Sequence, residues 1–209
     1  MNAPTFKANQ LPQGEVAHVV GSKDPELWHR TIPNIFKDTV YRFADREAAV
    51  FPEQEIRWTW AELDREVDAL AHGLLELGLQ KGDRVGIWSP NRYEWLLTQF
   101  ATARIGIILV TINPAYRVSE VEFALNKVGC KALITASHFK TSDYIGMLQD
   151  LAPELSRCEP GALTATKLAS LKTVIRTGPE TTSGMLNFDA VIESGRSGYS
   201  AALDAISAT

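Results

Sequence analysis

Apolar residues recur at spacings of three and four over much of the chain, which predicts amphipathic helices packed against a core. The clearest helix follows Thr59 and Glu62, which form a capping box, and Gly78 supplies the left-handed residue that ends it. The same spacing predicts further helices after Pro33, from Asn91 to Gly106, from Ser119 (with Glu122 as its acidic partner) to Gly129, and over Tyr144–Leu151.

Short apolar segments alternate with these helices and predict strands at 84–88, 107–111, 131–135 and 171–175. They are apolar at consecutive positions, which is typical of a sheet covered by helices on both faces. Strands separated by a single helix are expected to be parallel neighbours with right-handed crossovers. A hairpin is expected at Ala48–Phe51 and Glu55–Trp58. The predicted fold class is therefore α/β, with repeated strand–helix units that form a mainly parallel sheet.

The pattern divides the chain into three parts. Residues 1–26 contain prolines and glycines without apolar periodicity, which predicts an irregular N-terminal arm. Residues 27–177 contain the strand–helix units and are expected to form one α/β subdomain. Residues 178–209 are rich in Gly, Ser and Thr, so we expect a flexible, poorly ordered tail with a weak helix at Tyr199–Ile206.

Composition narrows the functional classes. The chain has 209 residues and a net charge of −4, which argues against a nucleic-acid binder because such proteins usually have a basic face. Its longest apolar run, Ile105 to Val110, is too short to span a bilayer, and no secretory signal is visible. The two cysteines have neither metal-site spacing nor the number for a disulfide framework. We therefore expect a cytoplasmic location.

Polar residues that follow the predicted strands are the candidate ligand contacts. Ligands of open parallel sheets bind at the carboxyl ends of the strands, here Ser89–Asn91, Ile112–Tyr116 and Ala136–His138. Asn113 offers an amide, Tyr116 a hydroxyl, and Lys140 a cation just beyond the third strand. Each segment also has a structural explanation: Ser89 and Asn91 as helix caps, Asn113 in a turn, His138 as a surface histidine.

Several catalytic motifs are absent from the sequence. It has no dinucleotide-binding Gly-x-Gly-x-x-Gly, no Gly-x-x-x-x-Gly-Lys-Ser/Thr phosphate loop and no Gly-x-Ser-x-Gly nucleophile elbow. No predicted strand ends in a carboxylate that could hold magnesium, so we expect neither a catalytic residue nor a metal site. The segment Thr181–Gly184 lacks a following lysine, and a flexible loop explains it better than a phosphate site.

Four segments, in order and spacing, resemble the adenylate-forming (AMP-binding) enzymes, and among them the acyl-CoA synthetases. They cover the N-terminal portion of that family, about residues 30–150, and are Trp58–Leu63, Gly78–Val85, Ala103–Pro114 and Val128–Thr135. The Asn113-Pro114-Ala115-Tyr116 sequence resembles the fatty or medium-chain acyl branch more than the amino-acid-activating branch.

The resemblance implies a two-step ligase reaction. A carboxylate and ATP, with Mg²⁺, give an acyl-adenylate, and coenzyme A then displaces AMP. The family's phosphate loop and catalytic lysine lie beyond the matched segments, so the chain alone is expected to be inactive and to bind no cofactor tightly. Asn113, Tyr116 and Lys140 would lie on the coenzyme A side.

Two further expectations concern how the chain behaves by itself. A sheet without its later neighbours keeps an unpaired edge near its final strands, so self-association is expected. The alternative to a ligase fragment is a stand-alone α/β module that binds a ligand or a partner without catalysis.

Overall fold

The computed structural model describes residues 21, 24, 28–198, 203 and 206. The chain divides into two units, residues 1–31 and 32–209, and every element below belongs to the second. The predicted arm at 1–26 lies outside the described residues, apart from Gly21 and Asp24. None of the helices in the described part of the chain has the length and apolar character needed to span a membrane.

The unit begins with a helix, a hairpin and a long second helix. Helix α1 (Ile32–Phe43) precedes the antiparallel strands β1 (Glu47–Phe51) and β2 (Ile56–Thr59), which the 3-10 turn η2 (Pro52–Gln54) joins. Helix α2 (Trp60–Glu76) starts at the predicted capping box, where Glu62 Oε2 accepts from the Thr59 backbone N–H at 2.8 Å. Gly78 follows α2 with φ +78°, so the predicted start and end of this helix are both confirmed.

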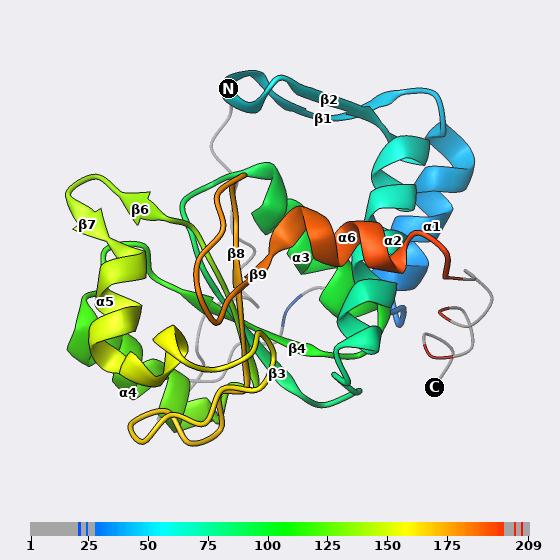
Figure 1. The fold of residues 1–209 in the computed structure, drawn as a ribbon. Helices are drawn as coiled ribbons and strands as arrows, with labels where there is room; N and C mark the ends of the chain where they lie inside the picture. The colour runs from blue at the N-terminus through cyan, green and yellow to red at the C-terminus, as the bar shows by residue number, and fades with distance from the viewer. Residues whose placement is uncertain (1–20, 22–23, 25–27, 199–202, 204–205, 207–209) are drawn as a thin grey trace, which may run out of the picture. The chain divides into compact units, whose positions relative to one another are not determined.

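Five parallel strands form the central sheet, in the order β4-β3-β5-β8-β9 (Figure 1). They are β3 (Arg84–Trp88), β4 (Ile108–Ile112), β5 (Ala132–Thr135), β8 (Thr173–Arg176) and β9 (Leu186–Asn187). The predicted parallel α/β sheet is confirmed. The expectation that consecutive strands are neighbours is wrong for β4 and β5, because both pair with β3. Because these strands are apolar on both faces, their sequences do not indicate on which side of β3 each following strand is added.

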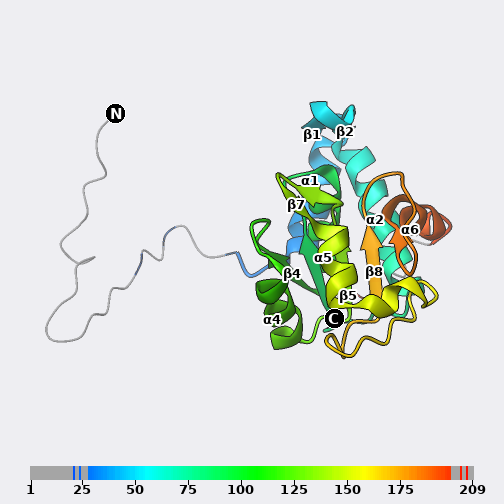
Figure 2. The same cartoon turned by 60° about the vertical axis from the view of Figure 1, so that its left-hand side comes forward.

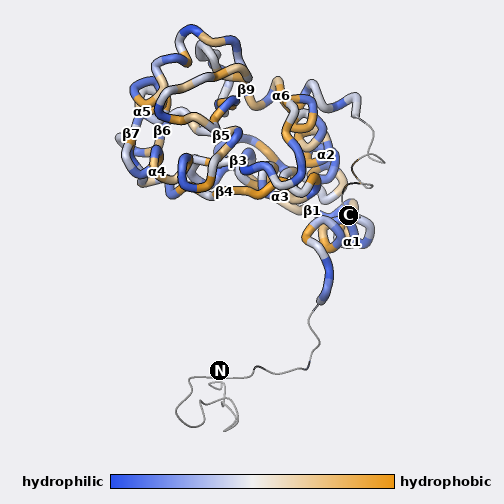
Figure 3. Tube along the Cα trace, turned by 90° about the horizontal axis from the view of Figure 1, so that it is seen from below, coloured by the Kyte–Doolittle hydropathy of each residue, from blue (hydrophilic) through white to orange (hydrophobic). Residues whose placement is uncertain are grey.

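Two layers of helices cover the sheet, one on each face (Figures 1 and 2). One core packs the sheet against α1, α2, α3 (Tyr93–Arg104) and α6 (Phe188–Gly195). The other packs it against α4 (Val118–Val128), α5 (Tyr144–Leu151) and the 3-10 turn η3 (Pro153–Ser156). A small hairpin, β6 (His138–Phe139) and β7 (Ser142–Asp143), precedes α5, whose predicted bounds are confirmed. In Figure 3 hydrophobic residues recur along the strands between these layers.

The starts of two helices differ from the predicted caps. The first N–H of α3, that of Tyr93, donates to Gln54 Oε1 at 3.0 Å, so a side chain from the distant hairpin caps this helix instead of Ser89 or Asn91. Helix α4 starts one residue before Ser119, and Glu120 accepts from the Arg117 backbone N–H at 3.1 Å. Ser119 is therefore not the cap, because the acidic partner is Glu120 and not Glu122.

The described part of the segment after residue 177 contains strand β9 (Leu186–Asn187) and helix α6 (Phe188–Gly195). Strand β9 extends the sheet, and Asn187 caps α6 by accepting from the Asp189 N–H at 2.9 Å. α6 lies against α2 so closely that a Cβ on Gly73 would meet the Val191 carbonyl oxygen at 2.0 Å (Figure 1). The poor order expected for residues 178–209 stays a prediction, and in the described part of this segment β9 and α6 pack against the sheet and α2. The helix expected at Tyr199–Ile206 lies outside the described residues, except for Leu203 and Ile206.

Candidate functional site at the carboxyl edge of the sheet

The carboxyl ends of the central strands lie along one edge, as the sequence predicted. In the parallel register Trp88 pairs with Ile112 on one side and with Thr135 on the other, and Thr135 pairs with Arg176. After β3 the chain goes to β4 on one side, and it then returns to place β5 on the other side. Ligands of open α/β sheets bind at such a reversal of strand order, which here lies between β3 and β5.

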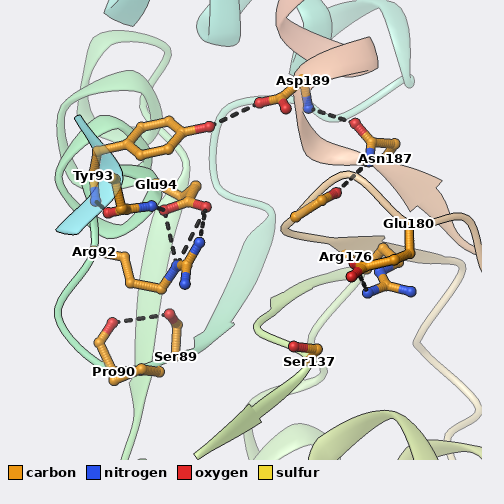
Figure 4. Close-up of polar contacts among 12 residues, drawn as sticks. Ser89, Pro90, Arg92, Tyr93, Glu94, Ser137, Arg176, Glu180, Asn187 and Asp189 are labelled. Atoms are coloured by element: carbon orange, nitrogen blue, oxygen red, sulfur yellow. Dashed lines mark hydrogen bonds and ion pairs between the residues drawn. The ribbon is translucent and has the colours of Figure 1, made fainter. Parts of the chain in front are cut away.

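A buried carboxylate organises the segment between β3 and α3. Glu94 is 1% exposed and binds the Arg92 guanidinium through two nitrogens, at 2.9 and 3.1 Å (Figure 4). Gln54 Nε2 also donates to Glu94 at 3.0 Å. The bond to Glu94 raises the pKa of Arg92 above its ordinary value. Glu94 therefore holds both the Arg92 cation and the tip of the hairpin at this edge.

A tyrosine and an aspartate connect the N-termini of α3 and α6. The Tyr93 hydroxyl donates to Asp189 Oδ1 at 2.8 Å (Figure 4). Burial and this hydrogen bond raise the pKa of Tyr93, so the hydroxyl stays a donor throughout the physiological range. Asn187 Nδ2, beside Asp189, donates to the Gly178 carbonyl at 2.6 Å and ties the loop after β8 to the start of α6.

Arg176 ends β8 and anchors that loop. Its side chain is 8% exposed, and one terminal nitrogen binds Glu180 Oε2 at 2.7 Å (Figure 4). The other terminal nitrogen donates to Thr182 Oγ1, also at 2.7 Å. Thr182 belongs to the Thr181–Gly184 segment, for which we predicted a flexible loop without phosphate contact. The structure shows a loop held by a buried guanidinium.

The predicted contacts Asn113 and Tyr116 lie in the loop after β4, and Lys140 lies in the β6–β7 turn. The Asn113 side-chain oxygen accepts from the Ala115 N–H at 2.9 Å, which is its predicted turn role. Tyr116 is 37% exposed, and Lys140 is exposed with its Nζ 5.3 Å from the centre of the Phe139 ring. No ligand tests them, so their coenzyme A role stays a prediction.

Two hydrogen bonds join the loop after β4 to strand β7 of the hairpin and to the first residue of α5. The Tyr144 hydroxyl donates to the Pro114 carbonyl at 2.5 Å, and Arg117 donates to Ser142 Oγ, also at 2.5 Å. Asn113, Tyr116 and Lys140 thus come from connected segments of one edge. His138, also in the hairpin, is exposed as predicted, and its Nδ1 lies 3.0 Å from Ser137 Oγ.

Sequence reasoning missed the charged residues that organise the edge. Gln54 reaches Glu94 across 40 positions, a contact that no local pattern encodes. Arg176 did leave a signal, because it directly follows the apolar pair Val174-Ile175, and a charged residue at the end of a buried strand needs polar partners. Within the described residues no group of three or more His, Cys, Asp or Glu could hold a metal ion. The hydrogen bonds and ion pairs of this edge therefore hold its charged side chains in fixed positions.

Comparison with known proteins gives a consistent family. The model of the AMP-binding enzyme family matches residues 36–196. The medium-chain acyl-CoA ligase ACSF2 of Rattus norvegicus is 44% identical over 187 residues, which are 90% of this chain and 30% of that protein. The putative acyl-CoA synthetase YngI of Bacillus subtilis is 39% identical, over 78% of this chain and 30% of that protein. The chain thus spans about a third of the length of these relatives.

Solved structures show the same fold at lower identity. The anthranilate CoA ligase AuaEII superposes with a TM-score of 0.67 at 19% identity, over 83% of this chain and 30% of that one. A putative long-chain-fatty-acid CoA ligase from Rhodopseudomonas palustris gives 0.63 at 24% identity, over 78% of this chain and 36% of that one. These likenesses establish the fold.

The expected cytoplasmic location is wrong by the same comparison. The ACSF2 relatives from rat and human are both named as mitochondrial proteins. The cytoplasmic expectation relied on the absence of a secretory signal and on cysteine content, and neither distinguishes two reducing compartments from each other.

Proposed function

We propose a function for this chain from one premise: the chain belongs to the AMP-binding enzyme family. The proposal is that it forms the N-terminal part of an ATP-dependent acyl-CoA ligase. That ligase joins a fatty or medium-chain carboxylate to coenzyme A through an acyl-adenylate, with release of pyrophosphate and then AMP. The supporting observation is the 44% identity, over 90% of this chain, to a protein named as a medium-chain acyl-CoA ligase.

The described residues supply the scaffold of such an enzyme. ATP needs hydrogen-bond donors around its phosphates, and Mg²⁺ needs carboxylate or phosphate oxygens as ligands. Within the described part of the chain no group of three candidate metal ligands exists. We propose that the isolated chain is inactive and binds neither tightly.

For coenzyme A the carboxyl edge of the sheet offers an exposed cation, Lys140. Lys140 is exposed at the tip of the β6–β7 hairpin, which the Arg117–Ser142 hydrogen bond ties to the loop of Asn113 and Tyr116. An ammonium group in this setting suits a phosphate of the ligand as a point charge. We propose that Lys140 faces such a phosphate and that Asn113 and Tyr116 shape the adjoining loop.

Replacing Lys140 tests this role. In the complete ligase, Lys140→Ala should weaken the apparent affinity for coenzyme A by about tenfold, the effect of one charge-assisted contact, and leave that for the carboxylate unchanged. The matched control is Lys127→Ala, an exposed lysine on α4. Equal coenzyme A affinities in both variants would remove Lys140 from the site.

The activity is tested by ATP–pyrophosphate exchange in the complete protein with straight-chain acids of short, medium and long length. We expect exchange to be fastest with medium-chain acids. If no acid supports exchange, the ligase proposal fails, and the stand-alone binding module becomes the better account.

A further inference from the structure

An open groove of about 500 Å³ runs along the outward face of α4. Its lining residues lie at the i, i+3, i+4, i+7 and i+8 positions of one helix face, and they are Ser119, Glu122, Phe123, Asn126 and Lys127. The opposite face carries Val121 and Leu125, each 1% exposed in the core beneath the helix. The groove therefore lies on the side of α4 that points away from the core.

An exposed phenylalanine lies in the middle of this groove. Phe123 is 68% exposed, whereas the other residues that line the groove are polar or charged. Single exposed apolar residues are common on protein surfaces, so Phe123 by itself identifies no partner. The charged residues beside it indicate what binds there.

The two charged residues of the groove have opposite signs. Glu122 lies one residue before Phe123, and Lys127 lies four residues after it. Neither forms an ion pair with another residue of the described part of the chain. Positions five apart on a helix do not face each other, so the two charges do not pair within α4.

A second copy of α4 that runs antiparallel to the first complements both charges. When Glu122 of one copy lies opposite Lys127 of the other, the same two-fold axis places Phe123 opposite Asn126. The two Phe123 side chains are then three positions apart along the helices, about 4.5 Å at 1.5 Å per residue. That offset is within reach of an aromatic contact, and two-fold symmetry repeats the Glu122–Lys127 pair.

We propose that the outward face of α4 binds a second copy of this chain across a two-fold axis. Burial of Phe123 supplies the affinity, and the two Glu122–Lys127 pairs set the register, because ion pairs near solvent contribute little binding energy. The contact shares no residue with the edge strand β4. It does not depend on ligase activity and can be tested on the chain itself.

Charge reversal tests the register. Glu122→Lys and Lys127→Glu each place like charges opposite each other, so each variant alone should have a dissociation constant about tenfold higher. A mixture of the two variants restores both pairs of opposite charge, and so does the double variant, so both should regain the original affinity. Sedimentation velocity over a range of concentrations measures these constants.

Replacing the aromatic residue tests the centre of the contact. Phe123→Lys should weaken association at least tenfold, whereas Tyr41→Lys should not, although Tyr41 is an aromatic residue with 90% exposure on another helix. All samples also carry Ile108→Lys, which places a charge on the exposed edge of β4 and opposes pairing there.

Weaker association of the single variants, with recovery in their mixture, supports the proposal. A mixture that associates no more strongly than its parts overturns it, as does equal association of Phe123→Lys and Tyr41→Lys. A chain with Ile108→Lys alone that is monomeric at every concentration overturns it too. In the complete protein, slow thiol labelling of Phe123→Cys in a monomer, beside fast labelling of Tyr41→Cys, would assign this face to another part of that protein and overturn the proposal.

Discussion

At the scale of single residues, Glu94 is the charge on which the carboxyl edge depends. It binds Arg92 through two nitrogens and Gln54 through one, while only 1% of it is exposed. The sequence showed Glu94 only as an acidic residue near a helix start. Its contact with Gln54 forms because the hairpin packs beside α3. Tertiary contacts determine that packing, and the local sequence does not encode it.

Glu94→Gln should lower the free energy of unfolding by about 2 kcal/mol. Removing one partner of a fully buried pair costs roughly 3–5 kcal/mol, and we reduce that figure because the Arg92 side chain is 35% exposed. Urea unfolding measures the difference, with Glu53→Gln, at an exposed position of η2 beside Gln54, as the control. A loss no larger than that of the control would show that the pair contributes little.

At the scale of elements, helices and strands were predictable where their signals are local. The capping box of α2, the bounds of α5 and the hairpin β1–β2 all follow from neighbouring residues. The strand order β4-β3-β5 and the short segments β9 and α6 were not predictable. β9 has two residues and α6 has eight, and both are stable because they pack against the sheet and α2, a contribution that no propensity contains.

The capping box makes a pH prediction. Hydrogen bonds from the backbone and the hydroxyl of Thr59 lower the pKa of Glu62 below 4.5. A folded-state pKa below the unfolded value means stability that is present above about pH 4.5 and lost as pH falls through the folded pKa. Glu62→Gln should therefore reduce the loss of folding stability that the protein shows as the pH falls. Urea unfolding midpoints between about pH 3 and 7 measure this pH dependence. The control Glu55→Gln, at an exposed position of the hairpin, should leave the pH dependence unchanged.

At the scale of the whole molecule, the sheet ends in two unlike edges. Strand β9 is two residues long, whereas β4 has five residues, Ile108–Ile112, without charge or proline. Unprotected apolar edges pair with other chains. The fold class and its helical layers followed from the sequence, but which strand forms the long edge did not, because it depends on the strand order.

The sequence placed the unpaired edge near the final strands, whereas the longer edge strand of the structure is β4, and we predict that the chain self-associates there. Ile108 is 53% exposed on this edge, and Ile108→Lys should shift the chain towards monomer because a charge on an edge strand opposes pairing. Sedimentation velocity over a range of concentrations measures the shift, with Tyr41→Lys on α1, where Tyr41 is 90% exposed, as control. An unaltered chain that remains monomeric at every concentration contradicts the prediction.

Our central proposal is that this chain is the structural N-terminal part of an acyl-CoA ligase and that the ATP-handling groups lie outside it. The most direct measurement is formation of acyl-adenylate from ATP and a medium-chain acid, in the isolated chain and in the complete protein side by side. We predict adenylate from the complete protein and none from the chain. Adenylate made by the isolated chain, or by neither protein, would contradict the account.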